Sequence, residues 1–441
     1  MKNSDYCSST LLLVGIALFS CQSKSTKEVS LVDSVNVEIP NYQLIPTDTF
    51  HFNNFVDCNM AEVWVGDTLR IFPGKYGEDP VWGFANDLKF ASGSNADEVF
   101  STPADQYIAP TLPKNAPTGQ PGLHGAVWFE TVYQDEKDPS GRTLFAIYHN
   151  ENYPETLPYE SKTGEGYLDK DWPLGLTDRI TPAAVPRIGV MKSTDGGWNW
   201  ENKGLFLEDK NPRMILKPHN TSKTFAGGVG DPSAVAVGEY LYLFYGEYGY
   251  PGIYEASSYD PDIESSAQCI SIARIKISDL DDPQGKAKRW DGTGFNAAWD
   301  GIGQPVTSLQ ISKDSGGGPA SSPTGGFHWG PSVSWNTYLE CWVMLMGKVE
   351  GQSWIGDELY ISFNPHQDLG AEANSQAWTK PKLLVEKPGH VLWYPSLQPL
   401  NTPEDIAAKS TSVKLGKKAR LFFKYSDLGK YMSEYIVEFE K

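Results

Sequence analysis

The sequence predicts an all-β protein with the architecture of a five-bladed β-propeller. Five short apolar strands along the chain each open with small or polar residues and are followed by a second, aromatic-rich strand. The composition points the same way, because 42 Gly and 31 Pro with little helical periodicity favour strands joined by turns. Units of several strands that recur along a chain with loop insertions are typical of propellers.

The five strand openings define the predicted blades. In chain order they are Asp57-Cys58-Asn59, His124-Gly125, Asp231-Pro232-Ser233, His328-Trp329-Gly330 and Trp393-Tyr394-Pro395. We expect the blades to cover residues 50–115, 123–208, 227–300, 327–386 and 391–441. Because the inner strands of a propeller surround its axis, we expect residues 57, 124, 231, 328 and 394 to line one polar channel.

The N-terminal residues predict export. The apolar run 11–20 is shorter than a membrane-spanning helix, so residues 1–20 are typical of a signal peptide. The run ends in Leu18-Phe19-Ser20-Cys21, which resembles a bacterial lipobox with Cys21 as the lipidated residue. An ordinary signal peptide is the alternative. We predict a flexible tether over 21–45, a propeller domain over 46–441, and a lipid anchor in the outer membrane of a Gram-negative bacterium.

Charge and cysteine content limit the partners. The net charge of −18 argues against binding to nucleic acid or to an anionic membrane surface, so membrane contact is expected only through the lipid anchor. We expect Cys58, Cys269 and Cys341 to be buried thiols. No cysteine or histidine spacing indicates zinc, and we expect a monomer that requires no cofactor. The 14 Trp and 22 Tyr offer flat faces for sugars, although most should pack between blades.

One turn motif is well defined. The segment Ser193-Thr194-Asp195-Gly196-Gly197-Trp198-Asn199-Trp200 fits the Asp-box pattern S-x-D-x-G-x-x-W. In this pattern Asp and Gly form a tight hairpin turn and the last Trp holds the turn against the sheet. We therefore predict a structural role for Asp195.

Three segments together resemble the five-bladed propeller glycosidases. Gly230-Asp231-Pro232-Ser233 resembles their blade opening, 193–200 their hairpin, and His328-Trp329-Gly330-Pro331 their axial histidine segment. This group comprises the family 43 arabinanases and xylosidases and related uncharacterised glycosidase-like lipoproteins of Bacteroidota. The resemblance implies a glycoside hydrolase that inverts the anomeric configuration. The chain departs from the pattern at its first two openings. The first opens with Asp57-Cys58-Asn59 rather than Asp-Pro, and in the second His124 stands where an Asp is expected. The usual Asp, Asp and Glu set is therefore not reproduced in its usual places.

Glycoside hydrolysis needs one protonated and one ionised carboxyl group beside the scissile bond. By the resemblance, Asp57 takes the position of the general base. Glu151, which leaves an aromatic strand after His149 and Asn150, is the predicted general acid, and Glu247 holds the same place in the third blade as a substitute. Asp231 is predicted to hold a sugar hydroxyl or to tune the acid. For Asp57 and Asp231 the alternative is an ordinary cap or turn role.

The remaining candidates would contact the substrate. They are Asn59, His124, His149, His328, Trp329, Trp393 and Tyr394. The resemblance also implies that His328 could ligate a structural calcium ion in the axial channel, where most other ligands would be oxygen atoms.

Three functions are compatible with this pattern. The favoured one is a glycoside hydrolase that acts on a polysaccharide or oligosaccharide. The second is a non-catalytic glycan-binding lipoprotein, which would keep the aromatic residues without needing convergent carboxylates. The third is a polysaccharide lyase that uses a pair such as His124 and Tyr394 on a uronate, although the acidic balance of the chain counts against it.

Overall fold

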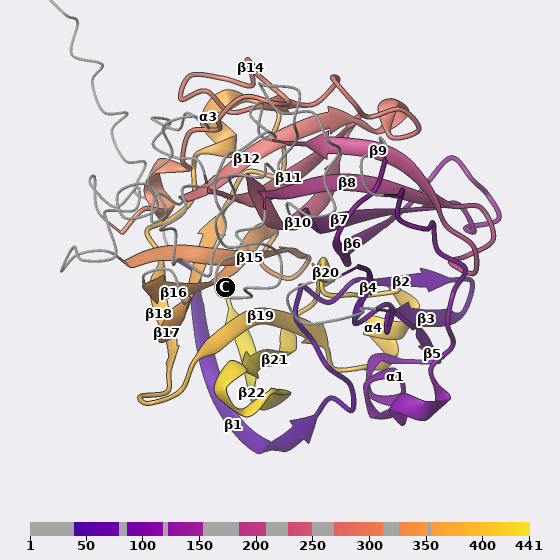
Figure 1. Cartoon of the computed structure of the whole chain (residues 1–441). Helices are drawn as coiled ribbons and strands as arrows, with labels where there is room; N and C mark the ends of the chain where they lie inside the picture. Colours follow the sequence, from indigo (N-terminus) through magenta and orange to yellow (C-terminus); the bar gives the residue numbers. More distant parts are fainter. Residues whose placement is uncertain are drawn as a thin grey trace, which may run out of the picture. The chain divides into compact units, whose positions relative to one another are not determined.

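The computed structural model describes residues 39–78, 86–117, 122–152, 185–208, 228–248, 269–311, 326–350 and 354–441. Residues 38–441 form one compact unit, and its strands assemble into five sheets (Figure 1). This arrangement confirms the predicted all-β class and the five-bladed propeller. In the described ranges no helix is both long and apolar enough to cross a membrane.

The strands of each blade pair mainly in antiparallel fashion. Blade one contains β2 (Glu62–Val65), β3 (Thr68–Ile71) and β5 (Ala91–Gly93), and is followed by α1 (Ala96–Ser101) and a 3₁₀ turn (Ala104–Gln106). Blade two contains β4 (Lys75–Gly77), β6 (Ala126–Gln134), β7 (Leu144–Asn152), β8 (Val185–Ser193) and β9 (Glu201–Leu207). Blade three contains β10 (Val229–Val237), β11 (Tyr240–Glu247), β12 (Cys269–Lys276), β13 (Lys288–Arg289) and β14 (Ala297–Ala298).

The last two blades each gain a strand from another part of the chain. Blade four contains β15 (Gly326–Asn336), β16 (Cys341–Glu350), β17 (Ile355–Asn364) and β18 (Lys382–Glu386), and it gains β20 (Lys414–Leu415), which runs parallel to β15. Blade five contains β19 (Leu392–Pro399), β21 (Lys418–Tyr425), β22 (Lys430–Glu440) and β1 (Asn41–His51). Short helices α3 (Glu372–Ser375) and α4 (Pro403–Ala407) lie in connections. β4 and β20 thus join sheets next to the blades predicted for them.

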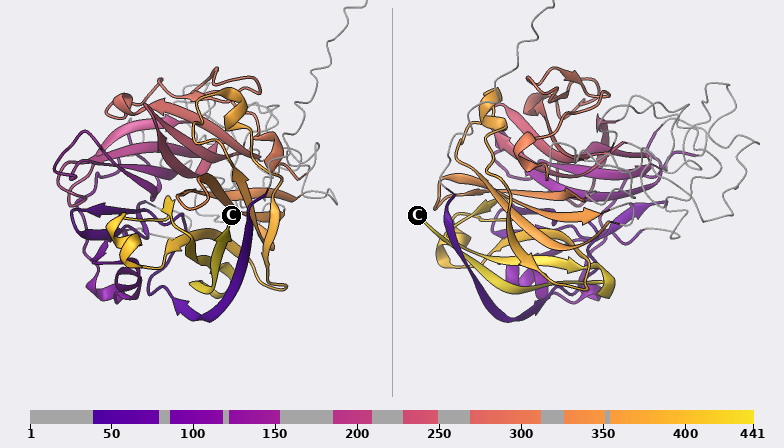
Figure 2. Two further views of the ribbon diagram at one scale, coloured as in Figure 1. Left: turned by 180° about the vertical axis from the view of Figure 1, so that it is seen from behind. Right: turned by 90° about the vertical axis from the view of Figure 1, so that its left-hand side faces the viewer.

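The N-terminal strand completes the last blade. β1 pairs with β22 from Asn41 opposite Glu440 to His51 opposite Met432, which places it at the edge of the C-terminal sheet (Figure 2). The predicted tether boundary at residue 45 was therefore wrong, because residues 41–45 belong to this strand. Tyr42 and Leu44 alternate with polar residues and pack against the core cluster of blades four and five, so this packing and the pairing with β22 specify the strand.

Strands inside the blades are buried on both faces. On β7, Phe145 and Ile147 pack in one apolar cluster with residues of blade three, whereas Leu144, Ala146 and Tyr148 pack in another with residues of blade one. A strand that is buried on both sides needs a continuous apolar run rather than alternation. This explains the apolar, aromatic-rich second strand of the repeating pattern.

Four inner strands carry a bulge at the equivalent position of their blade. The pairing register shifts between Phe129 and Thr131 in β6, and it shifts likewise before Ser233 in β10, Ser332 in β15 and Ser396 in β19. A bulge redirects the side chains beside it. The hydroxyl groups that follow also tie neighbouring blades together, because Thr131 Oγ1 accepts from the Ala234 N–H at 3.1 Å and Ser233 Oγ accepts from the Val333 N–H at 3.0 Å.

The segment 193–200 forms a turn fixed by side chains. Asp195 Oδ1 accepts from the backbone N–H groups of Trp198 and Asn199, both at 3.0 Å, and from Ser193 Oγ at 2.8 Å. Trp200 donates its indole N–H to the Gly197 carbonyl at 3.0 Å and packs against Phe129. These contacts give Asp195 a structural role in the turn between β8 and β9.

Candidate active site

Asp231 is the centre of the buried polar site at the propeller axis. It lies at the bulge of β10 with a φ of 46°, and only 3% of its surface is exposed. Its Oδ2 accepts from the Tyr248 hydroxyl and, at 3.2 Å, from the Trp329 indole N–H. Its Oδ1 accepts from the Tyr394 hydroxyl at 3.2 Å. Three aromatic donors from three strand ends therefore fix this carboxylate.

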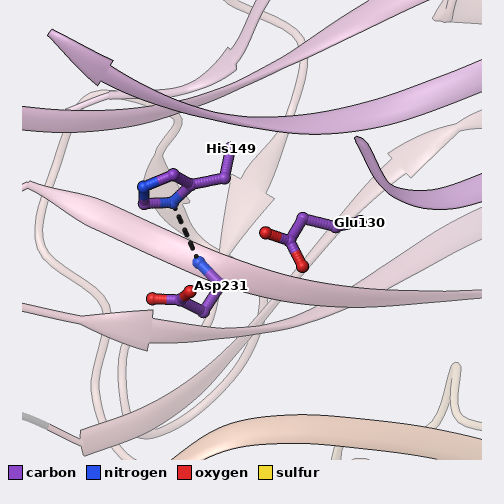
Figure 3. Close-up of side chains that lie close together, drawn as sticks. All are labelled: Glu130, His149 and Asp231. Carbon is purple, nitrogen blue, oxygen red and sulfur yellow. Dashed lines mark hydrogen bonds between the residues drawn. The ribbon is translucent and has the colours of Figure 1, made fainter. Parts of the chain in front are cut away.

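Glu130 is the second carboxyl group of the site. It projects from the bulge of β6 toward His149 and Asp231, and one ligand atom from each of the three residues lies within 4.8 Å of the others (Figure 3). Its Oε2 accepts from the Asn59 N–H at 2.8 Å, while its buried Oε1 has no hydrogen-bond partner among the described residues. Burial, followed by the charge of Asp231, raises the pKa of Glu130 well above its usual range. Glu130 can therefore hold a proton at neutral pH.

His149 supports Asp231 through the backbone. Its Nδ1 accepts from the Asp231 N–H at 3.1 Å (Figure 3), and its ring stacks edge-on against Trp128. Burial lowers the pKa of His149, which favours the neutral ring. Because Nδ1 accepts, the proton of the neutral ring lies on Nε2.

Asp57 and Lys424 form an ion pair at the more exposed side of the site. The Asp57 Oδ1 to Lys424 Nζ distance is 2.5 Å, and the Asp57 side chain is 28% exposed whereas that of Lys424 is 5% exposed. The ammonium group also lies 4.7 Å from the Phe55 ring centre and 5.0 Å from that of Trp393. Ring faces and a carboxylate together compensate the burial of this lysine.

Aromatic side chains surround Trp329. The centre of its ring lies 4.9 Å from that of Trp354, 5.0 Å from that of Tyr394 and 5.9 Å from that of Trp393. Trp393 is held in turn by an indole hydrogen bond to the Trp354 carbonyl at 2.8 Å. Trp354 and Trp393 are half-buried, so part of this wall faces outward.

A small polar cavity lies along the axis beside Glu130. Its volume of about 10 Å³ is close to the space that one water molecule needs. Asn59 spans the axis there, because its amide donates to the Pro232 carbonyl at 3.2 Å and to the Pro331 carbonyl at 3.3 Å. The lining residues are Asn59, Met60, Glu62, Glu130, Thr131, Val132, Ser233, Ser332, Ser396, Ser412 and Val413.

The structure brings most of the predicted site residues together. Those that meet around the Asp231 cluster and its aromatic wall are Asp57, Asn59, His149, Asp231, Trp329, Trp393 and Tyr394. Glu151 is half-buried two residues beyond His149 on β7, and Glu130 rather than Glu151 shares the cluster with Asp231. His124 is buried before β6, where its carbonyl accepts from the Asn150 amide at 2.6 Å.

The prediction that Glu247 serves as a substitute acid was wrong. Its Oε2 lies 2.8 Å from Arg289 Nη1 and accepts from the Gly303 N–H at 2.7 Å. Both side chains of this ion pair are buried inside blade three, so the carboxylate is paired within the sheet rather than facing the axis. The arginine that neutralises Glu247 is distant in the sequence.

The predicted axial position of His328 was also wrong. Its Nδ1 lies 2.5 Å from the Leu309 carbonyl and its ring packs against Tyr360, 4.9 Å between centres. Adjacent residues on a strand point to opposite faces, so Trp329 occupies the site while His328 turns into the blade. Burial lowers the pKa of His328 to about 4.

The axial residues fit a calcium ion poorly. In the described part of the chain, Glu130, His149 and Asp231 form the group that could ligate a metal. Calcium takes six to eight oxygen ligands. Here both oxygens of Asp231 already face hydrogen atoms of Tyr248, Trp329 and Tyr394, which would repel a cation. The donor set favours a proton on Glu130 over a metal ion.

Sequence reasoning missed Glu130, Tyr248 and Lys424. Glu130 interrupts the apolar strand Ala126–Val132, and Lys424 likewise interrupts Leu421–Tyr425. A charged residue inside a strand that is otherwise buried on both faces is the signal that would have found both. Tyr248 follows β11 directly, and no comparable feature distinguishes it from the other tyrosines.

Comparison with known proteins adds structural relatives of low similarity. No family model matches the chain, and no curated protein matches it. Among solved structures, the Bacillus subtilis arabinanase Arb43A is 9% identical, with 88% of this chain and 96% of that chain covered and a TM-score of 0.40. An α-L-arabinofuranosidase from Lactobacillus brevis is 10% identical, with coverage of 88% and 92% and a TM-score of 0.45. A family 43 endo-arabinanase from Bacillus licheniformis is 12% identical, with coverage of 89% and 96% and a TM-score of 0.41.

Proposed function

We propose that the protein is a glycoside hydrolase that acts on a polysaccharide or oligosaccharide at the axial site. One observation carries the proposal: two carboxyl groups of the site lie in contrasting surroundings. Glu130 is buried and its pKa is raised, whereas Asp57 is partly exposed and faces an ammonium group. A general acid and a general base that work side by side need this kind of division.

The surroundings assign the roles. Glu130 donates its proton to the glycosidic oxygen, which leaves as an alcohol. A water oxygen bonds to the anomeric carbon while Asp57 takes the proton of that water. Asp231, fixed by its aromatic donors, keeps the proton on Glu130 through its charge. We propose inversion of the anomeric configuration, as the resemblance to family 43 implies, and a monomer that needs no cofactor.

The test compares acid and base variants on neutral glycans and aryl glycosides. Glu130→Gln and Asp57→Asn should each lower kcat by about 10² to 10⁴. Asp57→Asn should also lower the melting temperature, because it leaves the buried Lys424 ammonium without its carboxylate, so both variants are checked for intact folding by circular dichroism. A nitrophenolate leaving group needs no proton, so Glu130→Gln should recover most of its activity on nitrophenyl glycosides while Asp57→Asn should not. Near-normal turnover of both variants on polysaccharide would refute the assignment. The first-formed anomer, read by NMR, tests inversion.

A non-catalytic glycan-binding protein is the second candidate. The observation that favours it is the ion pair of Asp57 with Lys424, which occupies the carboxylate that would activate water. Binding of oligosaccharides by calorimetry without release of reducing ends would establish this alternative.

The hypothesis of a polysaccharide lyase is weaker. The Tyr394 hydroxyl donates to Asp231, and burial raises the pKa of Tyr394, so this hydroxyl is a poor base. Unsaturated products detected by absorbance would indicate a lyase.

We propose further that the protein is exported and attached to the outer membrane through a lipid on Cys21, a residue outside the described ranges. The support is the sequence Leu18-Phe19-Ser20-Cys21. In a Gram-negative host, Cys21→Ser should abolish labelling with radioactive palmitate and release the protein from the membrane fraction. A Ser23→Ala variant, two residues away, should keep both properties. Membrane retention of Cys21→Ser would refute the lipid anchor.

A further inference from the structure

Hydroxyl groups from four blades line the small axial cavity beside Glu130. They belong to Thr131 in β6, Ser233 in β10, Ser332 in β15 and Ser396 in β19. Each stands directly after the register shift of its strand, so the four positions are equivalent in their blades. The cavity is therefore a product of the repeated bulge rather than a packing defect of one blade.

These hydroxyl groups have hydrogen atoms left to donate. Thr131 Oγ1 accepts from the Ala234 N–H at 3.1 Å, and Ser233 Oγ accepts from the Val333 N–H at 3.0 Å. A hydroxyl group that accepts a hydrogen bond still carries its own hydrogen. Across the described ranges, neither hydrogen has an acceptor and Ser332 Oγ makes no hydrogen bond. The lining thus offers donors to the cavity.

The lining also holds acceptors that lack a donor. Glu130 Oε1 and Asn59 Oδ1 are buried and have no partner among the described residues. The two residues are only 2% and 6% exposed. A buried polar atom without a partner destabilises the fold, so both oxygens call for a bound donor. Glu62 adds a second carboxyl group to the same lining.

We infer that the axial cavity binds one water molecule, which bridges the carboxyl groups of Glu130 and Glu62. The volume of about 10 Å³ admits a single water, and a buried water typically makes about three hydrogen bonds. Water can accept from hydroxyl groups and donate to carboxyl oxygens at the same time, so it completes both sets. The same volume leaves no room for a metal ion with water ligands of its own.

The consequence for catalysis rests on the proposed function. Once Glu130 has given its proton to the glycosidic oxygen, it is a buried carboxylate close to Asp231. The bridging water donates a hydrogen bond to that carboxylate, and protonated Glu62 donates to the water. Glu62 is thus a positioning residue that acts on the general acid through the water.

Other titratable groups surround the two carboxyl groups and stay unchanged in the test. Tyr431 lies close to Glu62. Those that face Glu130 are Asp57, Cys58, His149, Asp231, Tyr248 and Tyr394.

A crystal structure at a resolution that shows ordered water decides the binding site. We expect one water within hydrogen-bond distance of a carboxyl oxygen of Glu130 and of a carboxyl oxygen of Glu62. Absence of water from the cavity, a water that touches only one of the two, or a metal ion in its place would overturn the inference. This measurement does not depend on hydrolysis.

Two variants of Ser332 test what the water does. Ser332→Val brings an extra methyl group into the cavity and should displace the water. Ser332→Ala is the matched control, because it removes the same hydroxyl group but leaves the space. The titration of Glu130 is followed by NMR of glutamate labelled with ¹³C at the carboxyl carbon, and Glu130→Gln assigns the signal.

The pKa of Glu130 should be higher in Ser332→Val than in Ser332→Ala by about one unit or more, because the carboxylate loses a hydrogen bond. The alkaline limb of kcat should move with it on any glycan that is cleaved. Glu62→Gln should shift the pKa of Glu130 in the opposite direction, because it removes the charge that Glu62 gains above about pH 7.

Equal titration of Glu130 in Ser332→Val, Ser332→Ala and Glu62→Gln would overturn the action of the water on the general acid. If the wild type cleaves no glycan, the hydrolase proposal fails, whereas the crystal structure and the titration still decide the water site.

Discussion

Glu62 and Glu130 are two carboxyl groups that line the same axial cavity, and both have raised pKa values. Burial raises the pKa of Glu62 from 4.5 to about 7, against the opposing hydrogen bonds from Ser412 and Gln398. When Glu62 is ionised, the Gln398 amide donates to it at 2.9 Å with its oxygen accepting from Ser396. When Glu62 is protonated, it can donate to the Gln398 oxygen in the opposite amide orientation. The orientation of the hydrogen bond between Glu62 of blade one and Gln398 of blade five thus depends on whether Glu62 is protonated.

This contact predicts a pH dependence of stability. The folded state holds the Glu62 proton more tightly than the unfolded chain does, so the stabilisation is complete below about pH 4.5 and is lost as the pH rises through about 7. The loss amounts to roughly 3 kcal/mol for the shift involved. Glu62→Gln stays neutral, so its melting temperature relative to wild type should rise between pH 5 and pH 8.

The control is Glu136→Gln, which changes an exposed carboxyl group after β6. Its melting temperature relative to wild type should not vary over the same interval. A difference between Glu62→Gln and wild type that is independent of pH would contradict the role of the buried proton. Circular dichroism melts at matched ionic strength provide the comparison.

At the scale of single residues, the sequence correctly predicted which side chains face the site where this did not depend on the alternation of faces along the strand. Asp231 and Tyr394 were found because their bulges point them to the axis whatever the phase of the strand. His328 was misplaced by one residue, because alternation gives the axial face to Trp329. Glu247 had the expected position at a strand end, but Arg289 neutralises it, and no local sequence feature announces a partner from another strand.

At the scale of elements, the bulged inner strand is the unit that builds the site. A regular strand would continue its alternation past Asp231, whereas the bulge lets the residues before and after it serve different purposes. In blade three, Asp231 before the proline faces the site, and Ser233 after it accepts from the Val333 N–H of blade four. The tripeptide x-Pro-Ser stands at the same bulge in blades three, four and five.

The sequence contained these elements in readable form. The openings of blades three, four and five were identified from small or polar residues ahead of an apolar strand, and the turn 193–200 from its spacing of Asp, Gly and Trp. β1 was missed because its apolar alternation is confined to Tyr42 and Leu44 within an otherwise mostly polar segment. β4 and β20 were assigned to neighbouring blades because strands of two or three residues leave no periodicity to read.

At the scale of the whole propeller, two sets of contacts join blade five to the start of the chain. Between blade five and blade one, the buried Trp64 indole donates to the Ser410 carbonyl at 2.9 Å, and at the surface Lys409 Nζ donates to the Gly66 carbonyl at 2.6 Å. On the outer side, β1 supplies the edge strand of blade five. A ring built from one chain needs such contacts, because its first and last blades would otherwise separate.

We therefore predict that removal of β1 lowers the stability of the propeller, although every residue of the strand is exposed or half-buried. A protein that begins at residue 39 retains β1, whereas one that begins at residue 52 leaves β22 as an unpaired edge. The longer protein should match the form that begins at residue 22 in melting temperature. The shorter one should melt lower by about 5 °C or more, since each kcal/mol moves the melting temperature by a few degrees.

Adding a synthetic peptide of residues 39–51 to the shorter protein should recover part of the lost melting temperature, because an edge strand can bind in trans. A peptide with Leu44 and Ile45 replaced by proline is the matched control and should not. Equal melting temperatures for the proteins that begin at 39 and 52 would show that the contacts of Trp64 and Gly66 with residues 409 and 410 hold the ring closed without β1.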